Sequence, residues 1–414
     1  MALLNRFPNG KIQVHNTAGP RMTSISEPMA PAQARVAPKA SSRNAALDHA
    51  RSFLTLVVVL HHSVIPYTHY GHTDAKSWIG FDFVVTATDS FFMAMFFFLS
   101  GLFVWPSLSH KSLALHLRDR LLRLALPFAI AAVTVIPIAY YALELRHDPD
   151  LTFAAFWWKT VTVGPWPSGP LWFVWVLLVF DLVASLLYQL SPHLLDPINR
   201  LSQQSFNRPA RFFLLLLALT AVVYIPALIY FGPNRWFEFG PFSVQASRVL
   251  LYATYFFIGA GIGASHFSEG VLSADGRLAR SSWGWLIATL VPYCGMWVLI
   301  YIKRAILGNP DPQPDWYLAS YGFFFVAFSA AILFAILGFF LGSKRPWIIL
   351  DRMQGDAYGI FLVHYPIVLW LQYAMFDYDL PAIVKAAIAF VLTVIFSWVA
   401  AALLRKIPGA NHVL

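Results

Sequence analysis

The sequence predicts an all-α, polytopic membrane protein with about ten transmembrane helices and both chain ends in the cytoplasm. Of its 414 residues, 58% are hydrophobic and only 12% are charged. Soluble domains carry about 25% charged residues, so this composition excludes an ordinary water-soluble protein. A series of apolar runs, and an uneven distribution of basic residues between the loops that join them, complete the argument for this fold class.

The apolar runs approach the length of about 20 residues that a membrane-spanning helix needs. There are ten of them, at residues 52–68, 84–106, 121–143, 169–190, 211–231, 247–266, 283–302, 317–341, 357–375 and 382–404. The first run is short and contains two histidines, His61 and His62, so its hydropathy alone is low. Together the runs define a predicted transmembrane domain over residues 45–406.

Two polar segments flank this domain. Residues 1–44 are rich in Pro, Ala, Ser and Arg and show no apolar period, which predicts a disordered cytoplasmic tail. No apolar core precedes residue 52, so this tail is not expected to act as a signal peptide. Residues 407–414 are predicted to form a short cytoplasmic tail.

The basic residues give the orientation. With the N-terminus inside, 21 of the 29 Lys and Arg residues fall in cytoplasmic segments and 8 fall elsewhere. Cytoplasmic loops of membrane proteins carry such an excess of positive charge, so the bias supports ten helices with both ends inside. The same topology explains the net charge of +9, and we therefore expect membrane lipid rather than nucleic acid as a partner.

Cysteine usage excludes two kinds of site. Cys294 is the only cysteine, so the chain can form neither an internal disulfide framework nor a thiolate metal centre. Histidines and carboxylates show no cluster with zinc-type spacing. No metal site is predicted.

Polar residues in the first apolar run point to a functional site. At about 100° per residue, His62 returns to the helix face of Arg51, roughly 16 Å further along the axis. With Arg51 at the membrane surface, His62 lies near the middle of a bilayer about 30 Å thick, where an ionisable side chain is costly. Asp48, Thr55 and Ser63 lie on or near the same face, which predicts a polar stripe facing the protein interior.

A second basic element, RDRLLRLALPF, lies at the cytoplasmic end of the third run. Arg120 and Arg123 are three residues apart and share a helix face. Because guanidinium groups bind phosphate through paired hydrogen bonds, these residues, with Arg51 and Arg118, suit a cytoplasmic anion site for coenzyme A. The spacing alone favours an ordinary positive-inside loop in contact with anionic lipid.

Five segments carry motifs in a fixed order. They are LDHAR followed by VVVLHHS (47–63), FFFLSGLFVW (96–105), RLLR (120–123), GPLWFVWVLLVF (169–180) and YGIFLVHYPIV (358–368). In order, spacing and helix number, the chain resembles the membrane acyltransferase-3 family of bacterial O-acyltransferases over residues 47–404. The first and fourth segments resemble most the branch that includes succinyltransferases of periplasmic glucans.

The resemblance implies transfer of an acyl group, acetyl or succinyl, from cytoplasmic acyl-CoA to a hydroxyl of an exported or periplasmic glycan. Acyl-CoA is then a co-substrate, no cofactor is permanently bound, and the location is the bacterial inner membrane. By the same resemblance His62 and Arg51 are catalytic, with His62 as general base, and Arg120 and Arg123 bind the CoA phosphates. A neutral imidazole can take the hydroxyl proton, and a buried site excludes the water that would hydrolyse the thioester.

Further polar and aromatic residues are candidates for accessory roles at this site. They are Asp48, His61, Ser63, Ser100, Trp172, Asp181, Tyr358 and His364. His61 points about 100° away from His62 and is expected to pack or to support its neighbour's tautomer. Ser100 precedes Gly101 in what we interpret as a close helix-packing step, because no nucleophile elbow surrounds it.

Three of these assignments stay open at the level of sequence. Trp172 suits either the acceptor entrance or an interfacial aromatic belt. Asp181 is expected to face the bundle and to pair with an arginine or a histidine, and His364 is expected to make a structural hydrogen bond. Exposed loop or helix-end positions are predicted for His49, His69, His72 and His110.

Two other functions compete with the enzyme. A proton-coupled secondary transporter of a glycan or small metabolite would use intramembrane His and Asp residues, but such folds show paired broken helices in two matching halves. No such symmetry is visible, and the polar residues concentrate in the first run. A scaffold or lipid head-group binder leaves the Arg51–His62 stripe unexplained.

Overall fold

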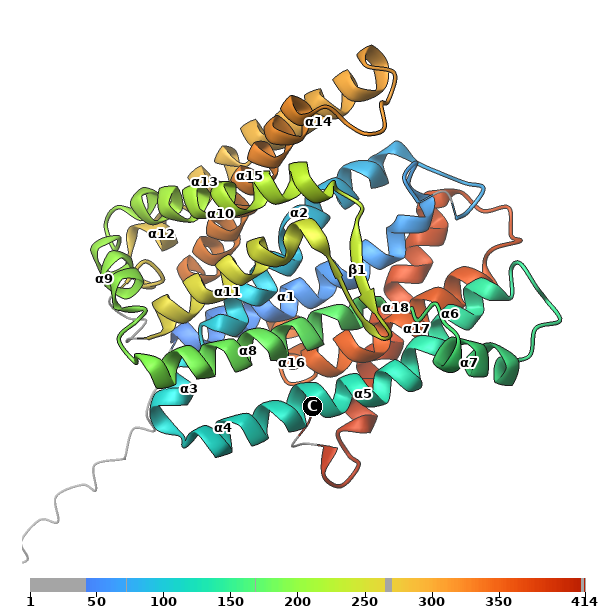
Figure 1. Cartoon of the computed structure of the whole chain (residues 1–414), viewed down its shortest axis with the longest axis horizontal. Helices are drawn as coiled ribbons and strands as arrows, with labels where there is room; N and C mark the ends of the chain where they lie inside the picture. The colour runs from blue at the N-terminus through green and yellow to red at the C-terminus, as the bar shows by residue number, and fades with distance from the viewer. Residues whose placement is uncertain (1–41, 72, 168, 265–269, 411–412, 414) are drawn as a thin grey trace, which may run out of the picture. The chain divides into compact units, whose positions relative to one another are not determined.

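The computed structural model describes residues 42–71, 73–167, 169–264, 270–410 and 413, which are mostly helical (Figure 1). The predicted all-α, polytopic fold is confirmed. Most of the predicted N-terminal tail lies outside the described residues, which begin at Ser42. The tail at 1–44, the domain limits at 45 and 406 and the tail at 407–414 stay predictions.

Nine helical segments of the described chain are long and apolar enough to cross a membrane, and they correspond to the second to tenth predicted runs. Their bounds are Ile79–His110, Leu113–Glu144, Gly169–Leu190, Pro209–Phe231, Ala246–Gly263, Ser282–Ile306, Asp315–Gly342, Ala357–Ala374 and Ala382–Leu404.

Some of these spanning segments are a single helix, and others contain two or more consecutive helices. The helices are α2 (Ile79–Gly101), α3 (Val104–His110), α4 (Leu113–Arg120), α5 (Leu126–Val133), α6 (Val135–Glu144), α8 (Trp172–Leu190), α10 (Pro209–Phe231), α11 (Val249–Gly263), α13 (Ser282–Ala288), α14 (Leu290–Tyr301), α15 (Asp315–Gly342), α17 (Ala357–Ala374) and α18 (Ala382–Leu404). Shorter helices connect them: α7 (Phe153–Thr162), α9 (Asp196–Gln204), α12 (Arg277–Arg280) and α16 (Ile348–Met353). The described residues also include short 3₁₀ or π-helical segments: η1 (Ile65–Tyr67), η2 (Leu121–Ala125), η3 (Gly169–Leu171), η4 (Ala246–Arg248) and η6 (Ile302–Ile306).

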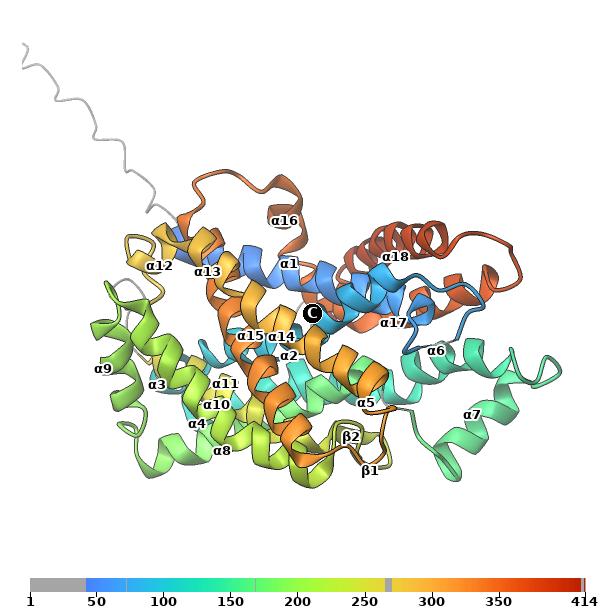
Figure 2. The same ribbon diagram turned by 90° about the horizontal axis from the view of Figure 1, so that it is seen from above.

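The first predicted run forms α1 (Ser42–Val64), a helix of 23 residues whose charged and histidine residues make it less apolar than the other nine. From Ala46 to Val64 none of its residues is exposed. Helix α1 packs against α2, α15, α16, α17 and α18 (Figures 1 and 2). A helix surrounded by protein need not be apolar on every face, and this explains how α1 carries polar residues inside the bundle.

Helices α2 and α11 cross at a distance that only glycine permits. A Cβ atom on Gly101 would lie 2.0 Å from the carbonyl oxygen of Phe256, and one on Gly259 would lie 2.2 Å from that of Phe98. Gly263 meets Leu102 in the same way at 2.0 Å. Gly259 and Gly263 form a Gly-x-x-x-Gly pair, so the Ser100-Gly101 step is the close packing contact that the sequence indicates.

One β-hairpin interrupts the helical architecture of the described residues. Strand β1 (Trp236–Phe239) pairs antiparallel with β2 (Phe242–Gln245), and Phe239 faces Phe242 across a two-residue loop. Such loops need a positive φ at their first residue, and Gly240 provides a φ of 55°. The Trp175 indole of α8 donates a hydrogen bond to the Ser243 carbonyl oxygen at 3.0 Å, which anchors the hairpin to the bundle.

A buried ion pair fixes the loop that follows α1. The Lys385 ammonium of α18 lies 2.9 Å from the Asp74 carboxylate, and the two side chains are 2% and 3% exposed. Lys385 also donates to the carbonyl oxygen of Phe376 at 3.2 Å. On the same loop, Lys76 pairs with Asp379 at 2.7 Å, but both side chains of that pair are well exposed.

The orientation of these helices in the membrane remains a prediction, and reporter fusions test it. Because the positive charge is concentrated on one side, fusions at residues 75, 150 and 310 are expected to report the periplasm, and a fusion after residue 410 the cytoplasm. A periplasmic signal from the C-terminal fusion would contradict the topology and the side from which the donor enters.

Candidate active site

The predicted cytoplasmic side of the bundle contains a cavity of about 530 Å³, which we call the inner cavity. Its lining includes three of the predicted arginines and residues from α1, α2, α4, α8 and α17. The polar side chains that line it are Arg51, Thr55, Ser100, Ser107, Lys111, Asp119, Arg120, Arg123, Gln354 and Tyr358. Arg118 is exposed and does not line this cavity, so the four-arginine cluster that the sequence suggests reduces to three.

The cations of the inner cavity differ in how they are paired. Arg51 donates to Asp48 on the preceding turn at 2.9 Å. Arg120 lies 3.4 Å from Asp181, whose side chain is 1% exposed, and this identifies the partner that the sequence leaves open. Among the residues that the structure describes, Arg123 makes no ion pair, and its side chain is exposed. Arg123 is therefore the arginine most available to an incoming anion.

A π-helical turn, η2, carries Arg123. It begins directly after Arg120 and joins α4 to α5. The Tyr358 hydroxyl of α17 donates a hydrogen bond to the Arg123 carbonyl oxygen at 2.7 Å. Single π-helical turns inside helices are frequent at functional sites, and here Tyr358 attaches such a turn to the wall of the inner cavity.

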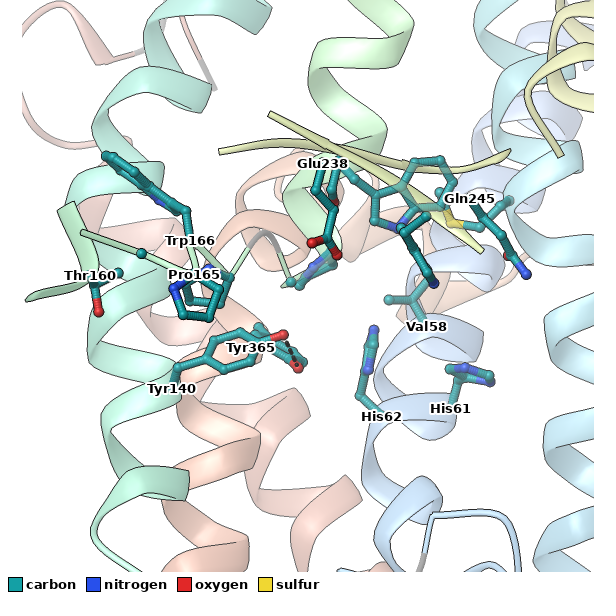
Figure 3. Close-up of a pocket in the computed structure, with 18 of the residues that line it drawn as sticks. Val58, His61, His62, Tyr140, Thr160, Pro165, Trp166, Glu238, Gln245 and Tyr365 are labelled. Carbon is teal, nitrogen blue, oxygen red and sulfur yellow. Dashed lines mark hydrogen bonds between the residues drawn. The ribbon is translucent and has the colours of Figure 1, made fainter. Parts of the chain in front are cut away.

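A second cavity of about 720 Å³, which we call the outer cavity, lies on the other side of the bundle (Figure 3). The hairpin and the segment after α7 border it, and His62 points into it from α1. It combines aromatic residues with acidic and basic ones. Its aromatic and charged lining comprises His61, His62, Asp89, Phe92, Tyr140, Glu144, Asp148, Phe156, Lys159, Trp166, Trp172, Trp236, Glu238, Arg248, Tyr252, Phe361 and Tyr365.

Two aromatic side chains of α17 surround His62. The ring centroids of His62 and Tyr365 are 5.0 Å apart, and those of His62 and His364 are 5.3 Å apart. The Tyr365 hydroxyl donates a hydrogen bond of 3.3 Å to Tyr140 on α6 (Figure 3). The imidazole of His62 therefore lies between a tyrosine pair and a second histidine, with one side open to the outer cavity.

His61 is held differently from its neighbour. Its Nδ1 lies 2.7 Å from the Thr88 hydroxyl of α2, and its ring packs on Phe92 at 4.9 Å. Figure 3 shows the His61 ring turned away from the direction in which His62 points. Both histidines border the outer cavity, but only His61 has a side-chain hydrogen bond described here that fixes its ring.

His364 is completely buried beside His62. Its Nδ1 lies 2.7 Å from the Phe361 carbonyl oxygen, which is the structural hydrogen bond that the sequence predicts. A carbonyl oxygen can only accept, so Nδ1 carries a proton. The other nitrogen, Nε2, is buried and has no hydrogen-bond partner within the described structure.

The structure brings the other predicted accessory residues to three places. Ser100 and Tyr358 line the inner cavity, while Asp48 and Asp181 hold two of its arginines. Trp172 lines the outer cavity and stacks on Tyr252 with ring centroids 5.4 Å apart. Ser63 borders neither cavity, and its hydroxyl donates to the Val59 carbonyl oxygen.

The prediction for His49 is wrong. The residue is 8% exposed, and its Nε2 lies 2.5 Å from the Asp351 carboxylate on α16. Its exposure could not be judged from helix position alone, because α16 is 302 residues away in sequence and covers the start of α1. His69 pairs with Asp82 at 2.8 Å, His110 is exposed, and His72 lies outside the described residues.

The sequence does not predict an ion pair that lines the outer cavity. Arg248, in the turn before α11, donates two hydrogen bonds to the Asp89 carboxylate on α2, at 2.8 and 2.5 Å. The guanidinium also lies over the Phe325 ring, 5.0 Å from its centroid. The two residues are 159 positions apart in the sequence, and only the packing of α2 against α11 brings them together.

Comparison with known proteins identifies the family. A family model described as an acyltransferase domain, that of the acyltransferase-3 family, matches residues 44–402. No curated protein and no solved structure matches the chain. The match includes every lining residue of the outer cavity, all but Val413 of the inner cavity, and every predicted site residue from Asp48 to His364. The chain therefore belongs to the acyltransferase-3 family and is a multi-pass membrane acyltransferase.

Proposed function

We propose that this protein moves an acyl group from cytoplasmic acyl-CoA to a hydroxyl group of an exported or periplasmic glycan. The observation that carries the proposal is the division of the site into two cavities, with Arg51, Arg120 and Arg123 around the inner one and His62 in the outer one. A donor with phosphate groups and an acceptor with hydroxyl groups need these two different environments. Family membership favours this enzyme over the transporter.

The inner cavity fits the donor. Arg123 is exposed there, and Arg51 and Arg120 each keep donors beyond the single carboxylate that they contact. Guanidinium groups bind phosphate oxygens in a bidentate way, so the pyrophosphate and 3′-phosphate of CoA suit this cluster. The pantetheine arm then points toward α1 and the middle of the membrane.

The outer cavity fits a glycan acceptor. Trp166, Trp172 and Trp236 offer apolar aromatic faces to the C–H groups of a sugar ring. Glu144 and Glu238 carry oxygens that accept hydrogen bonds from hydroxyl groups. A glycan from the periplasm can enter there without crossing the membrane.

In the proposed reaction His62 is the general base. Its imidazole takes the proton from the acceptor hydroxyl, the hydroxyl oxygen attacks the thioester carbonyl carbon, and the carbon–sulfur bond breaks. The products are an ester and free CoA, whose thiolate gains a proton in the inner cavity while His62 releases its own to the outer cavity. The donor acyl group, acetyl or succinyl, and the inner membrane as location are part of this proposal.

Replacing Arg123 with alanine is expected to weaken CoA binding by about tenfold or more, since a hydrogen bond between charged groups contributes about 1.5–3 kcal/mol. The loss should shrink at high salt, because ions screen exposed charges. Isothermal titration or a thermal shift with CoA on the purified protein in lipid measures the effect. Arg118→Ala is the matched control, because Arg118 is exposed on the same segment but does not line the inner cavity.

The comparison of these variants decides whether Arg123 binds the CoA donor or only contacts lipid. CoA affinity that is unchanged in Arg123→Ala, or lowered equally by Arg118→Ala, would contradict the donor site. Transfer of label from acyl-CoA to a glycan by the parent protein tests the whole proposal.

A further inference from the structure

Four helices cross the boundary between the two cavities at one level. On α1 the lining changes from Thr55 in the inner cavity to Val58 in the outer one, a step of about 4.5 Å along the helix axis. On α2 it changes between Met93 and Phe96. The boundary between the cavities is therefore thin.

The other two helices, α8 and α17, change sides at the same level. On α8, Trp172 lines the outer cavity and Phe173 the inner one. On α17, Tyr358 lines the inner cavity, Tyr365 the outer one, and Phe361 lines both. Phe361 is therefore the residue at which the two cavities meet.

Three phenylalanines close this boundary. The ring centroids of Phe96 and Phe173 are 5.7 Å apart, those of Phe96 and Phe361 are 6.1 Å apart, and those of Phe173 and Phe361 are 5.6 Å apart. All three rings are buried. Each comes from a different helix, so the rings form a mutually packed triangle between the arginines and His62.

The composition of the triangle determines what can cross it. Aromatic rings offer no hydrogen bond to a carboxylate or a phosphate, and an unpaired charge among apolar side chains is strongly unfavourable. A short apolar acyl chain carries no charge, so its burial among these rings has no such cost. The same rings limit the entry of water from the inner cavity to the thioester carbon.

We infer that Phe96, Phe173 and Phe361 form an aromatic partition through which only the acyl end of the donor reaches His62, and that this partition selects short, uncharged acyl groups. The inference rests on the proposed function, since it concerns the same donor and acceptor. It assigns the three phenylalanines as specificity-determining residues and an acetyl-sized group rather than a succinyl group as the donor.

Three donors separate the effect of charge from that of length. Acetyl-CoA is short and uncharged, butyryl-CoA has four carbons and no charge, and succinyl-CoA has four carbons and a carboxylate. The parent protein is expected to transfer acetyl at least tenfold faster than either of the others. Phe361→Leu opens space and keeps the site apolar, so the ratio of butyryl to acetyl transfer should rise at least tenfold while succinyl transfer stays low.

A second phenylalanine provides the matched control. Phe180 lies on α8, is buried among Phe97 and Phe256, and borders neither cavity. Phe180→Leu therefore removes similar core volume without touching the partition, and its donor preference should equal that of the parent. Parent protein that uses succinyl-CoA as well as acetyl-CoA, or a Phe361→Leu variant with the parent's donor preference, would overturn the inference.

A labelling experiment tests the partition without relying on catalysis. In a Cys294→Ser background, Thr55→Cys and Val58→Cys place single thiols on the two sides of the boundary. A charged, membrane-impermeant thiol reagent applied from the cytoplasmic side of inside-out vesicles should label Thr55→Cys and spare Val58→Cys. Adding Phe361→Ala should make the Val58→Cys thiol reactive.

These results separate the two proposals. Equal labelling of both thiols in the presence of Phe361 would show that no partition exists, whatever the enzyme transfers. Inactivity of the parent protein with all three donors, together with side-selective labelling, would instead reject the proposed reaction and leave the partition standing.

Discussion

Replacing His62 with alanine is expected to lower acyl transfer by about 10² to 10⁴, which is the usual contribution of a general base. His62 points into the outer cavity beside Tyr365 and His364, and the described structure assigns its ring no hydrogen bond that would occupy it. CoA binding should be unchanged, because His62 does not border the inner cavity. Transfer of labelled acetyl from CoA to glycan by purified protein in lipid measures the first effect, and CoA titration measures the second.

The neighbouring histidine is the control for this experiment. The Nδ1 of His61 contacts the Thr88 hydroxyl, so His61→Asn retains a polar group near that position. This variant is expected to keep most of the parent's activity. If His62→Ala transfers at the parent rate, or if both variants lose activity to the same extent, His62 is not the base.

Replacing Lys385 with methionine is expected to destabilise the protein by about 3–5 kcal/mol, the usual cost of removing one partner of a buried ion pair. The Asp74 carboxylate is 3% exposed and would be left without its cation. The midpoint of thermal unfolding in detergent should fall, and rapid loss of monodisperse protein on gel filtration should accompany it.

Two further variants show whether the buried charge is the cause. In the double variant Lys385→Met, Asp74→Asn no charge remains unpaired, so much of the lost stability should return. The exposed pair Lys76–Asp379 lies on the same loop, and Lys76→Met should leave the unfolding midpoint unchanged. A double variant no more stable than Lys385→Met would mean that packing, not charge, accounts for the loss.

The sequence predicts the membrane helices well, because hydropathy depends on each segment by itself. The second to tenth runs coincide with the nine spanning segments of the described chain. Hydropathy gives α1 a low score as a membrane helix, because other helices cover it and its surface need not be apolar. Nothing in the sequence pattern indicates the β1–β2 hairpin, whose anchoring depends on Trp175 of a separate helix.

At the candidate site, helix periodicity predicts which residues share a face of one helix, but it does not predict which residues of different helices are in contact. It places Arg120 near Arg123, and the structure has both at the inner cavity. Periodicity does not reveal that Asp181 is the partner of Arg120, because that contact joins α4 to α8. The same limit hides the pairing of Asp89 with Arg248 and the contact between His62 and Tyr365. The π-helical turn at Arg123 departs from regular helix geometry and so escapes any rule based on a fixed period.

The burial of α1 has a consequence for biosynthesis. A segment that contains Asp48, Arg51 and three histidines gains little from contact with lipid, so it is a poor candidate for stable insertion on its own. Four of the helices that shelter it, α15, α16, α17 and α18, belong to the last hundred residues of the chain. Helix α1 leaves the ribosome before these four helices, so its polar face is not fully covered until they are made. Quality-control proteases that recognise unassembled polar helices would therefore detect an unfinished C-terminal region through the exposure of α1.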